Sequence, residues 1–190
     1  MDYNKINKNS IKIIEILIYG KAYFNEIHEK TGIKSKNNLL KNLNNFVEAR
    51  ILLKEEKKAN TFFSINYSNS ISVAIINLIN SLKFEKLAFN IKKSIIECIF
   101  KLKPKTTILF GSYAKNNYKK ESDIDLLFFD SIKEKREELR DISKSYGVQI
   151  NATFLNFGEL DLQSEAIKHI FKTGYPINGA IYFYNEFKKI

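Results

Sequence analysis

The sequence predicts an α+β protein with a helical N-terminal part that ends in a β-hairpin and a C-terminal α/β part. Three observations support this fold class. Apolar residues recur at helical spacing from Ser10 onward. Two strand-like runs follow Arg50, and beyond Thr106 β-rich runs alternate with helical ones. The 190 residues, 44% of them hydrophobic, are enough to bury a core in one ordinary domain or two small ones.

Three short helices are predicted within the first fifty residues. Gly20 ends the first helix, which starts at Ser10, and Gly32 ends the second, which covers Tyr23–Thr31. Ser35 provides an N-cap for the third helix. The inward positions of the three helices are Ile11, Ile14, Leu17 and Ile18; Phe24, Ile27 and His28; and Leu39, Leu43, Phe46 and Val47.

A β-hairpin follows, with strands at Ile51–Glu55 and Thr61–Tyr67 joined by a polar turn. Three short helices and a hairpin are the outline of a winged helix-turn-helix domain, which we assign to residues 1–70. In that fold the third helix enters the DNA major groove and the hairpin touches the backbone. Winged helices also serve as protein-binding or packing modules, so DNA binding is one of two interpretations. Its candidate residues are Lys36, Asn37, Asn38, Lys41, Lys57 and Lys58.

The net charge of +10 and the pI of about 9.4 suit nucleic acid or another polyanionic ligand. However, Lys accounts for 28 of the 31 basic residues and is scattered along the chain. Residues 1–70 carry 12 basic minus 7 acidic groups, or +5, and the remainder carry 19 minus 14, also +5. Basicity alone therefore does not decide the partner.

A long helical region at residues 71–103, with one break near Phe84–Phe89, bridges the two parts. Its broad apolar face leaves room for a homodimer contact, although packing within the chain accounts for the same face. Polar residues interrupt its apolar stretches, so we expect no membrane span. The N-terminus lacks the apolar segment of a signal peptide, and the lone Cys98 excludes a disulfide. We therefore expect a soluble, cytoplasmic protein.

The C-terminal part, residues 104–190, is predicted to alternate strands and helices. The expected strands are Thr106–Phe110, Ile124–Phe129 and Val148–Leu155; the expected helices are a short one after Ser112, a charged one at Ile132–Ser145 and an amphipathic one at Phe157–Phe171.

Two short motifs in this part predict its chemistry. Gly111-Ser112 ends a strand and opens a helix, where glycine allows close backbone approach and free N–H groups suit a phosphate. Asp123 and Asp125 lie two residues apart on the next strand, so their carboxylates point to the same side. Such a pair repels unless it shares a cation, and hard oxygen ligands suit Mg²⁺ or Mn²⁺. A phosphate-binding turn beside a pair of metal ligands indicates phosphoryl or nucleotidyl transfer.

Gly111-Ser112, ten intervening residues and Asp123-x-Asp125 resemble the signature of the DNA polymerase β-like nucleotidyltransferase superfamily. The flanking residues, 109–114 and 122–127, resemble its small prokaryotic minimal nucleotidyltransferase branch. The resemblance covers roughly residues 90–175 and implies a small α/β domain with a mixed sheet. Helix-turn-helix domains fused to this enzyme domain are a familiar arrangement.

The resemblance implies that Gly111 and Ser112 hold a nucleoside triphosphate, and that Asp123 and Asp125 bind Mg²⁺. It also implies a third carboxylate on a later strand, and by spacing the matching residue is Asn151. Asparagine can offer a metal its carbonyl oxygen but cannot act as a base. General-base help is typically worth about 10²–10⁴-fold in rate.

Three outcomes remain open for the departure at Asn151: binding without turnover, slow turnover, or rescue by another carboxylate. The candidate rescuers are Glu121, Glu159 and Asp161, the last two of which also suit a helix N-terminus. Lys115, with Lys119 and Lys120, lies between the two motifs and could neutralise phosphate or simply face water. His28 and His169 are read as structural or surface residues.

Two functions follow. The first is an enzyme that transfers a nucleoside monophosphate, with AMP from ATP as the leading candidate, to a hydroxyl of a protein, RNA or small molecule. The resemblance adds a protein tyrosine as one acceptor, because minimal members of the family act as antitoxins that add AMP to a partner toxin. The second is a transcriptional regulator with a winged helix and a catalytically weak or inactive nucleotide-binding domain.

Overall fold

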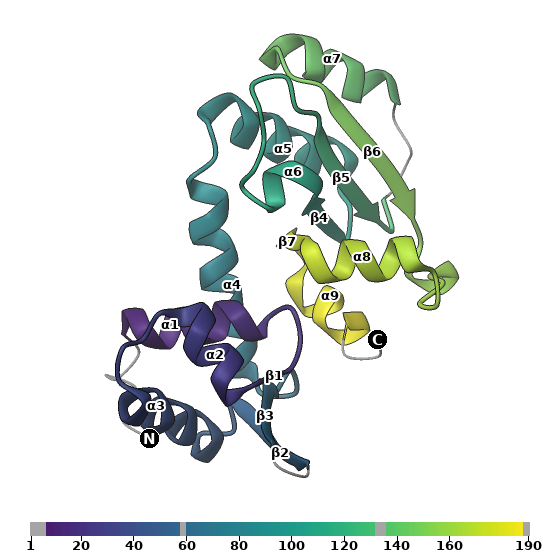
Figure 1. Cartoon of the computed structure of the whole chain (residues 1–190). Helices are drawn as coiled ribbons and strands as arrows, with labels where there is room; N and C mark the ends of the chain where they lie inside the picture. Colours follow the sequence, from purple (N-terminus) through teal and green to yellow (C-terminus); the bar gives the residue numbers. More distant parts are fainter. Residues whose placement is uncertain (1–6, 58–59, 132–135, 188–190) are drawn as a thin grey trace. The chain divides into compact units, whose positions relative to one another are not determined.

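The computed structural model describes residues 7–57, 60–131 and 136–187, and the chain divides into two compact units, Met1–Ile79 and Asn80–Ile190 (Figure 1). Lys58 of the predicted DNA-binding set and residues 132–135 of the predicted charged helix lie outside the described residues.

The first unit contains helices packed on a small antiparallel sheet. Its elements are α1 (Lys8–Leu17), β1 (Ala22–Tyr23), α2 (Phe24–Thr31), α3 (Lys36–Glu48), β2 (Leu52–Lys57), β3 (Asn60–Ile65) and α4 (Ser70–Glu85), which runs across the boundary between the units. The strand order is β1-β3-β2, and β3 is antiparallel to both neighbours. The three helices and the hairpin predicted from the sequence are therefore present.

Local side-chain caps explain where these helices begin. Ser35 Oγ accepts a hydrogen bond from Asn38 N at 3.2 Å, which confirms it as the N-cap of α3. The predicted start of the first helix at Ser10 is wrong, because Asn7 caps the helix three residues earlier and Ser10 is buried inside it. Ile13, which was not among the predicted inward positions, is a fully buried core residue, whereas Ile11 is half-buried. His28 and Val47, predicted to face inward, are half-buried too.

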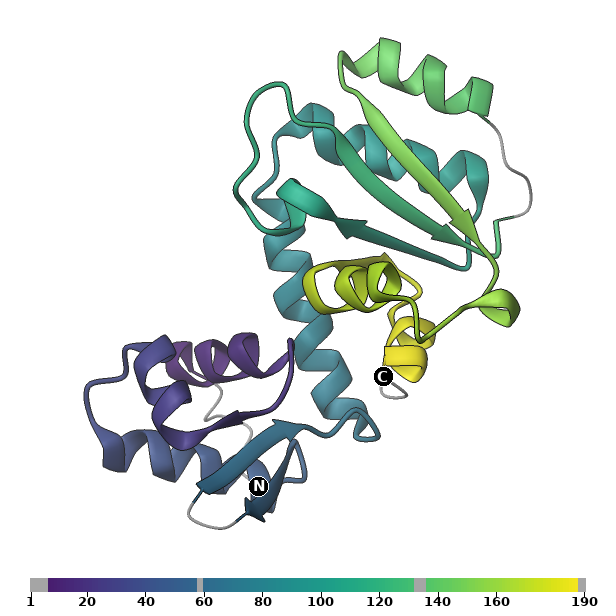
Figure 2. The same cartoon turned by 45° about the vertical axis from the view of Figure 1, so that its right-hand side comes forward.

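The second unit is built on a mixed four-stranded sheet, as predicted. Its elements are α5 (Phe89–Leu102), β4 (Thr106–Phe110), α6 (Gly111–Ala114), β5 (Ile124–Phe129), α7 (Arg136–Tyr146), β6 (Ile150–Leu155), a 3₁₀ turn (Phe157–Glu159), α8 (Glu165–Thr173), β7 (Tyr175–Asn178) and α9 (Ala180–Phe187). The strand order is β6-β5-β4-β7, with β5 and β6 parallel and β4 antiparallel to β5 and β7. Figure 2 shows β4, β5 and β6 side by side.

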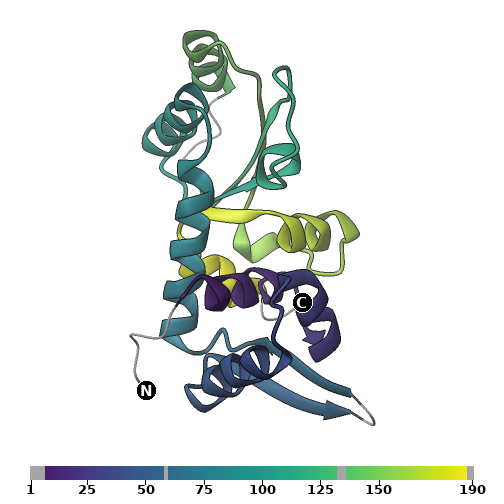
Figure 3. The same ribbon diagram turned by 60° about the vertical axis from the view of Figure 1, so that its left-hand side comes forward.

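Helices cover both faces of this sheet. Figure 3 shows α5 and α7 on one side of the strands and α6 and α8 on the other. The apolar core joins α5, the sheet and α7 through residues such as Ile95, Cys98, Leu126 and Ile142, each nearly inaccessible to solvent. Every residue of β5 is buried except Asp125. A charged side chain within such an apolar strand costs solvation free energy, which favours a functional role.

The predicted amphipathic helix at Phe157–Phe171 is wrong in its first half. A 3₁₀ turn occupies Phe157–Glu159 and α8 begins only at Glu165. Polar side chains hold the intervening turns, because Asn156 Nδ2 donates to Glu159 Oε2 at 2.9 Å and Asp161 Oδ1 accepts from Gln163 N at 2.9 Å. Such local bonds compete with helix formation.

Two elements near the C-terminus, β7 and α9, were missed by the sequence interpretation. The signal was a short run, Tyr175–Asn178, bounded by Gly174 and Gly179. Pro176 lies on the edge strand β7, where a missing N–H is tolerated. β6 also starts two residues later than expected, because Gly147 (φ 62°) and Val148 cap α7: Val148 N donates to Ser143 O.

No helix in the described part of the chain is both long enough and apolar enough to cross a membrane.

Candidate nucleotide and metal site

The two predicted motifs meet at one end of the mixed sheet, where β4 ends and β5 and β6 begin. Phe110, the last residue of β4, lies opposite Asp125 in the antiparallel β4–β5 ladder. Asp125 in turn lies opposite Asn151 in the parallel β5–β6 ladder. The pairing of three strands therefore brings Gly111, Asp125 and Asn151 into one row, although up to 40 residues separate them in the sequence.

Gly111 allows the chain to pass directly over the Asp125 carboxylate. Its φ of 69° lies in the left-handed region that glycine adopts without strain. A Cβ built on Gly111 would stand 2.9 Å from Asp125 Cγ and closer still to Oδ2. Glycine is therefore required here for two reasons, conformation and space.

The helix that follows, α6, has only four residues. A single turn cannot sum many peptide dipoles, so its contribution to a phosphate site comes from individual N–H groups rather than from a macrodipole. Ser112 is half-buried beside Gly111 at the start of this turn.

Each aspartate of the pair faces an amide side chain, Asn151 from β6 and Gln149 from the residue just before this strand. Asn151 Nδ2 donates to Asp125 Oδ1 at 3.4 Å, and Gln149 Nε2 donates to Asp123 Oδ2 at 3.3 Å. Gln149 was not singled out from the sequence. The signal was available in the matching spacing of Gln149-x-Asn151 and Asp123-x-Asp125, but only the parallel register of the two strands aligns these pairs.

The electrostatics of the pair are those of a cation site. Burial raises the pKa of the Asp125 carboxyl, the hydrogen bond from Asn151 opposes this rise, and the negative charge of Asp123 adds to it. A divalent cation would relieve both the burial cost and the mutual repulsion.

The donor atoms fit a metal that is bound together with a phosphate ligand. Among the residues that the structure describes, no cluster of three or more His, Cys, Asp or Glu side chains gathers around one point. The available donors are two carboxylates and, after rotation of its amide, the carbonyl oxygen of Asn151. This set of hard oxygens suits Mg²⁺, which takes the rest of its shell from waters and substrate phosphates.

Two of the three alternative carboxylates are held away from the pair. Asp123 precedes β5 and Asn151 lies near the start of β6, whereas Glu159 and Asp161 follow the opposite end of β6. Both are also engaged in the local turns described above. Glu121 is an exposed residue of the loop before Asp123. It alone of the three remains next to the site in the chain.

The loop between the motifs carries the predicted lysines. Lys115 Nζ lies 3.3 Å from Nε2 of His169, an exposed residue of α8, in keeping with the prediction of a structural or surface role for this histidine. Lys119 and Lys120 are exposed, and Lys119 N donates to Ser122 Oγ at 2.8 Å. The stacked rings of Tyr113 and Tyr118, with centroids 4.3 Å apart, anchor this loop.

The predicted DNA-binding residues of the first unit lie mostly on one helix. Lys36, Asn37, Asn38 and Lys41 are all exposed on α3. On the hairpin, Lys57 Nζ lies 2.7 Å from Glu55 Oε1, so its charge is locally balanced.

A match to a known protein family supports the resemblance found in the sequence. Residues 93–179 match the family described as "Polymerase beta, Nucleotidyltransferase", and this segment contains Gly111, Asp125, Asn151 and the other residues of the candidate nucleotide and metal site. A solved structure described as "Crystal structure of the toxin-antitoxin with AMP-PNP" is similar at a TM-score of 0.38 and 15% identity, over 51% of this chain and 83% of that chain. Comparison with curated proteins found no match.

Proposed function

Residues 93–179 form a nucleotidyltransferase domain of the polymerase β family, and on this premise we propose that the protein transfers a nucleoside monophosphate to a hydroxyl acceptor. AMP from ATP is the leading candidate for the transferred group. The observation that carries the proposal is the contact of the Gly111 backbone with the Asp125 carboxylate. It supports a phosphate site and a metal site directly beside each other.

Each residue has a role in this proposal. Gly111 and Ser112 hold the triphosphate, and Lys115 pairs with one of its phosphates. Asp123 and Asp125 hold Mg²⁺ or Mn²⁺, which neutralises charge that develops on the phosphate oxygens. The acceptor oxygen attacks the α-phosphorus, the bond to the β-phosphate oxygen breaks and pyrophosphate leaves. Since the amide of Asn151 cannot take the hydroxyl proton, the proton passes to solvent.

Incubation with each α-labelled nucleoside triphosphate and Mg²⁺ or Mn²⁺ tests the proposal, with cell lysate or RNA as acceptor. We expect the wild type to transfer label and the Asp123→Ala/Asp125→Ala variant to transfer none. Equal transfer by both proteins would show that this site is not the catalytic one.

Asn151→Asp is expected to raise the transfer rate by about 10²–10⁴-fold, because a carboxylate at this position can accept the hydroxyl proton and complete the metal site. The rate is measured as label transferred over time. Thr153→Asp is the matched control, since it adds the same charge at an exposed position two residues further along β6. If both variants behave like the wild type, position 151 is not the place where a general base can act.

A second candidate function is supported by the first unit and by Asn151 itself. Three helices with a three-stranded antiparallel sheet, and the exposed polar surface of α3, suit a winged helix-turn-helix domain that binds DNA. In this proposal residues 1–70 form the winged domain, residues 71–103 form bridging helices and residues 104–190 form the nucleotidyltransferase domain. The protein would then be a regulator that binds nucleotide with little or no turnover.

The double variant Lys36→Ala/Lys41→Ala is expected to weaken DNA binding and to lower the slope of log affinity against log salt by about 0.9 for each phosphate that the variant no longer neutralises. Titration of a DNA duplex at several salt concentrations measures both effects. Lys8→Ala, an exposed lysine on α1, is the control and is expected to leave the slope unchanged. A wild type without any salt-dependent DNA affinity would rule out the DNA-binding role.

A further inference from the structure

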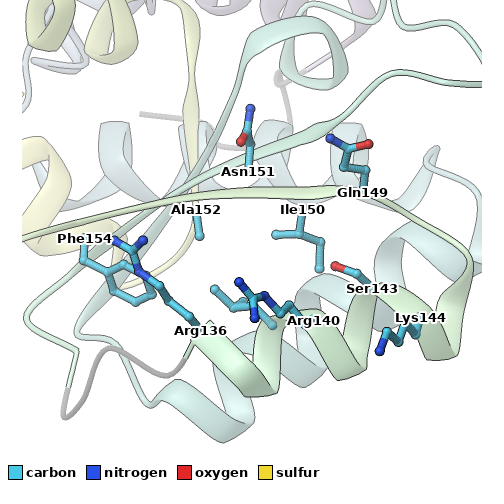
Figure 4. Close-up of a pocket in the computed structure, with 10 residues that line it drawn as sticks. Arg136, Arg140, Ser143, Lys144, Gln149, Ile150, Asn151, Ala152 and Phe154 are labelled. Carbon is cyan, nitrogen blue, oxygen red and sulfur yellow. The ribbon is translucent and has the colours of Figure 1, made fainter.

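A groove of about 500 Å³ lies between α7 and β6, on the opposite side of β6 from the aspartate pair. In Figure 4, Gln149 and Asn151 point away from α7, whereas Ile150 and Ala152 point toward it. The β6 side chains that point toward α7 are therefore apolar, while Ser143, Gln149 and Asn151 add polar groups to the lining of the groove. Its other wall is cationic, because α7 contributes Arg136, Arg140 and Lys144.

The charges of α7 are sorted between its faces. The three cations are spaced four residues apart and line the groove, whereas no acidic residue in the described part of the chain does so. Glu138 and Asp141 lie on another side, where both act electrostatically on Lys101 of α5. Arg140 and Lys144 form no ion pair with the residues that the structure describes. The groove is thus a positively charged surface rather than a solvated face of mixed charge.

The use of arginine at this groove is selective. The chain has only three arginines among its 31 basic residues, and two of them are Arg136 and Arg140. The guanidinium group differs from the lysine ammonium in its planar set of donors, which matches a carboxylate or phosphate in two parallel hydrogen bonds. In a chain that otherwise uses lysine, this pair favours recognition of an anionic group.

β6 is one of the two edge strands of the sheet, and its outward backbone groups border the groove. Ile124 N donates to Gln149 O and Asp130 N donates to Leu155 O, so the odd-numbered residues of β6 direct their backbone groups toward β5. Since these directions alternate along a strand, the N–H and C=O groups of Ile150, Ala152 and Phe154 point to the open edge. Such an edge can accept a further strand.

The spacing of the cations fits an added strand. Residues four apart on a helix are separated by about 6 Å along its axis, and alternate residues of a strand are separated by about 6.6–6.8 Å. Figure 4 shows α7 running alongside β6. A chain paired with β6 would therefore place every second side chain near one of the three cations.

We propose that this groove binds an extended peptide segment of a partner protein in which acidic residues occupy every second position, paired as an additional strand on the edge of β6. The carboxylates contact Arg136, Arg140 and Lys144, and their stems lie on Ile150, Ala152 and Phe154. The apolar β6 side chains and the open backbone edge favour a peptide over a nucleic acid, which would use the cations but neither of the other two features.

The test uses the full-length protein and a labelled ten-residue peptide of alternating Asp and Val, with fluorescence anisotropy as readout. The matched peptide with Asn in place of Asp is expected to bind at least about tenfold more weakly, because a charge-assisted hydrogen bond contributes about 1.5 kcal/mol or more. Arg140→Glu/Lys144→Glu is expected to weaken binding of the acidic peptide by about a hundredfold through two such bonds. Lys93→Glu/Lys172→Glu makes the same charge change elsewhere and is expected to leave binding intact.

Strand pairing is tested on the peptide rather than on the protein, so that no folding defect intervenes. N-methylation of alternate amides blocks the hydrogen bonds of one peptide edge. Two peptides are compared, each methylated on one of the two alternate sets of amides (the two methylation phases). Methylation of the set that faces β6 is expected to reduce affinity at least about tenfold, and methylation of the other set is expected to be tolerated.

Four results would overturn the proposal. The first two are that the acidic peptide does not bind at millimolar concentration and that the Asn peptide binds with equal affinity. The other two are that both methylation phases leave the affinity equal and that Arg140→Glu/Lys144→Glu binds the acidic peptide as tightly as the wild type. A single-stranded RNA of equal charge that binds more tightly, and loses this affinity in the same variant, would assign the groove to nucleic acid instead. Since none of these measurements requires nucleotide transfer, the result is independent of the proposed enzyme activity.

Discussion

Asp125→Ala is expected to lower Mg²⁺-dependent ATP affinity by more than about a hundredfold. Loss of a residue that only hydrogen-bonds a metal ligand already lowers metal affinity by about 10–100-fold, and Asp125 would be a ligand itself. The variant removes a hard oxygen ligand from the point where Gly111 and Asn151 converge. The fold should remain intact, because the substitution also removes the repulsion from Asp123 and the burial cost, which together raise the pKa of Asp125. Calorimetric titration with ATP, with and without Mg²⁺, measures the loss.

Asp123→Ala is expected to behave in the same way, and the thermal unfolding temperature should change little in either variant. Asp141→Ala is the matched control, since Asp141 is an exposed acid on α7 away from the site. Unchanged ATP affinity of Asp125→Ala in the presence of Mg²⁺ would remove the basis of the site assignment.

Gly111→Ala is expected to abolish nucleotide binding by a different route. An alanine at a φ of 69° costs about 1–2 kcal/mol of stability, because its Cβ approaches the following carbonyl oxygen. The same Cβ would also overlap the Asp125 carboxylate, which must then rotate away from its position. ATP affinity and the free energy of unfolding are the two quantities to measure.

Gly147→Ala separates these two effects. Gly147 has a similar φ of 62°, but a Cβ there meets nothing within 4 Å. Both variants are expected to lose about 1–2 kcal/mol of stability through backbone strain, and only Gly111→Ala is expected to lose nucleotide binding. Equal ATP affinity of the two variants would mean that the contact between Gly111 and Asp125 is not needed for the ligand.

The strands and helices whose signals are local could be predicted from the sequence with nearly correct bounds. Ile124–Phe129 and Thr106–Phe110 are apolar, β-rich runs of a few residues, and the structure has them at those bounds. The α3 helix starts where its Ser35 cap predicts, because that cap is a bond between residues three apart. Errors arose where local and periodic signals compete, as at Phe157–Phe171, where turn-forming side chains override an apolar pattern.

The sequence by itself determined which groups make up the candidate site, since a Gly-Ser turn after a strand and two aspartates at i and i+2 of an extended segment are local features of the chain. Only the tertiary structure decided which groups surround them. The parallel pairing of β5 with β6 brings Gln149 to Asp123, and the packing of α6 beside α8 brings His169 to Lys115. The cationic groove likewise exists only because α7 packs alongside the edge strand β6. Strand register and helix packing depend on contacts between residues far apart in the chain, and no local spacing encodes them.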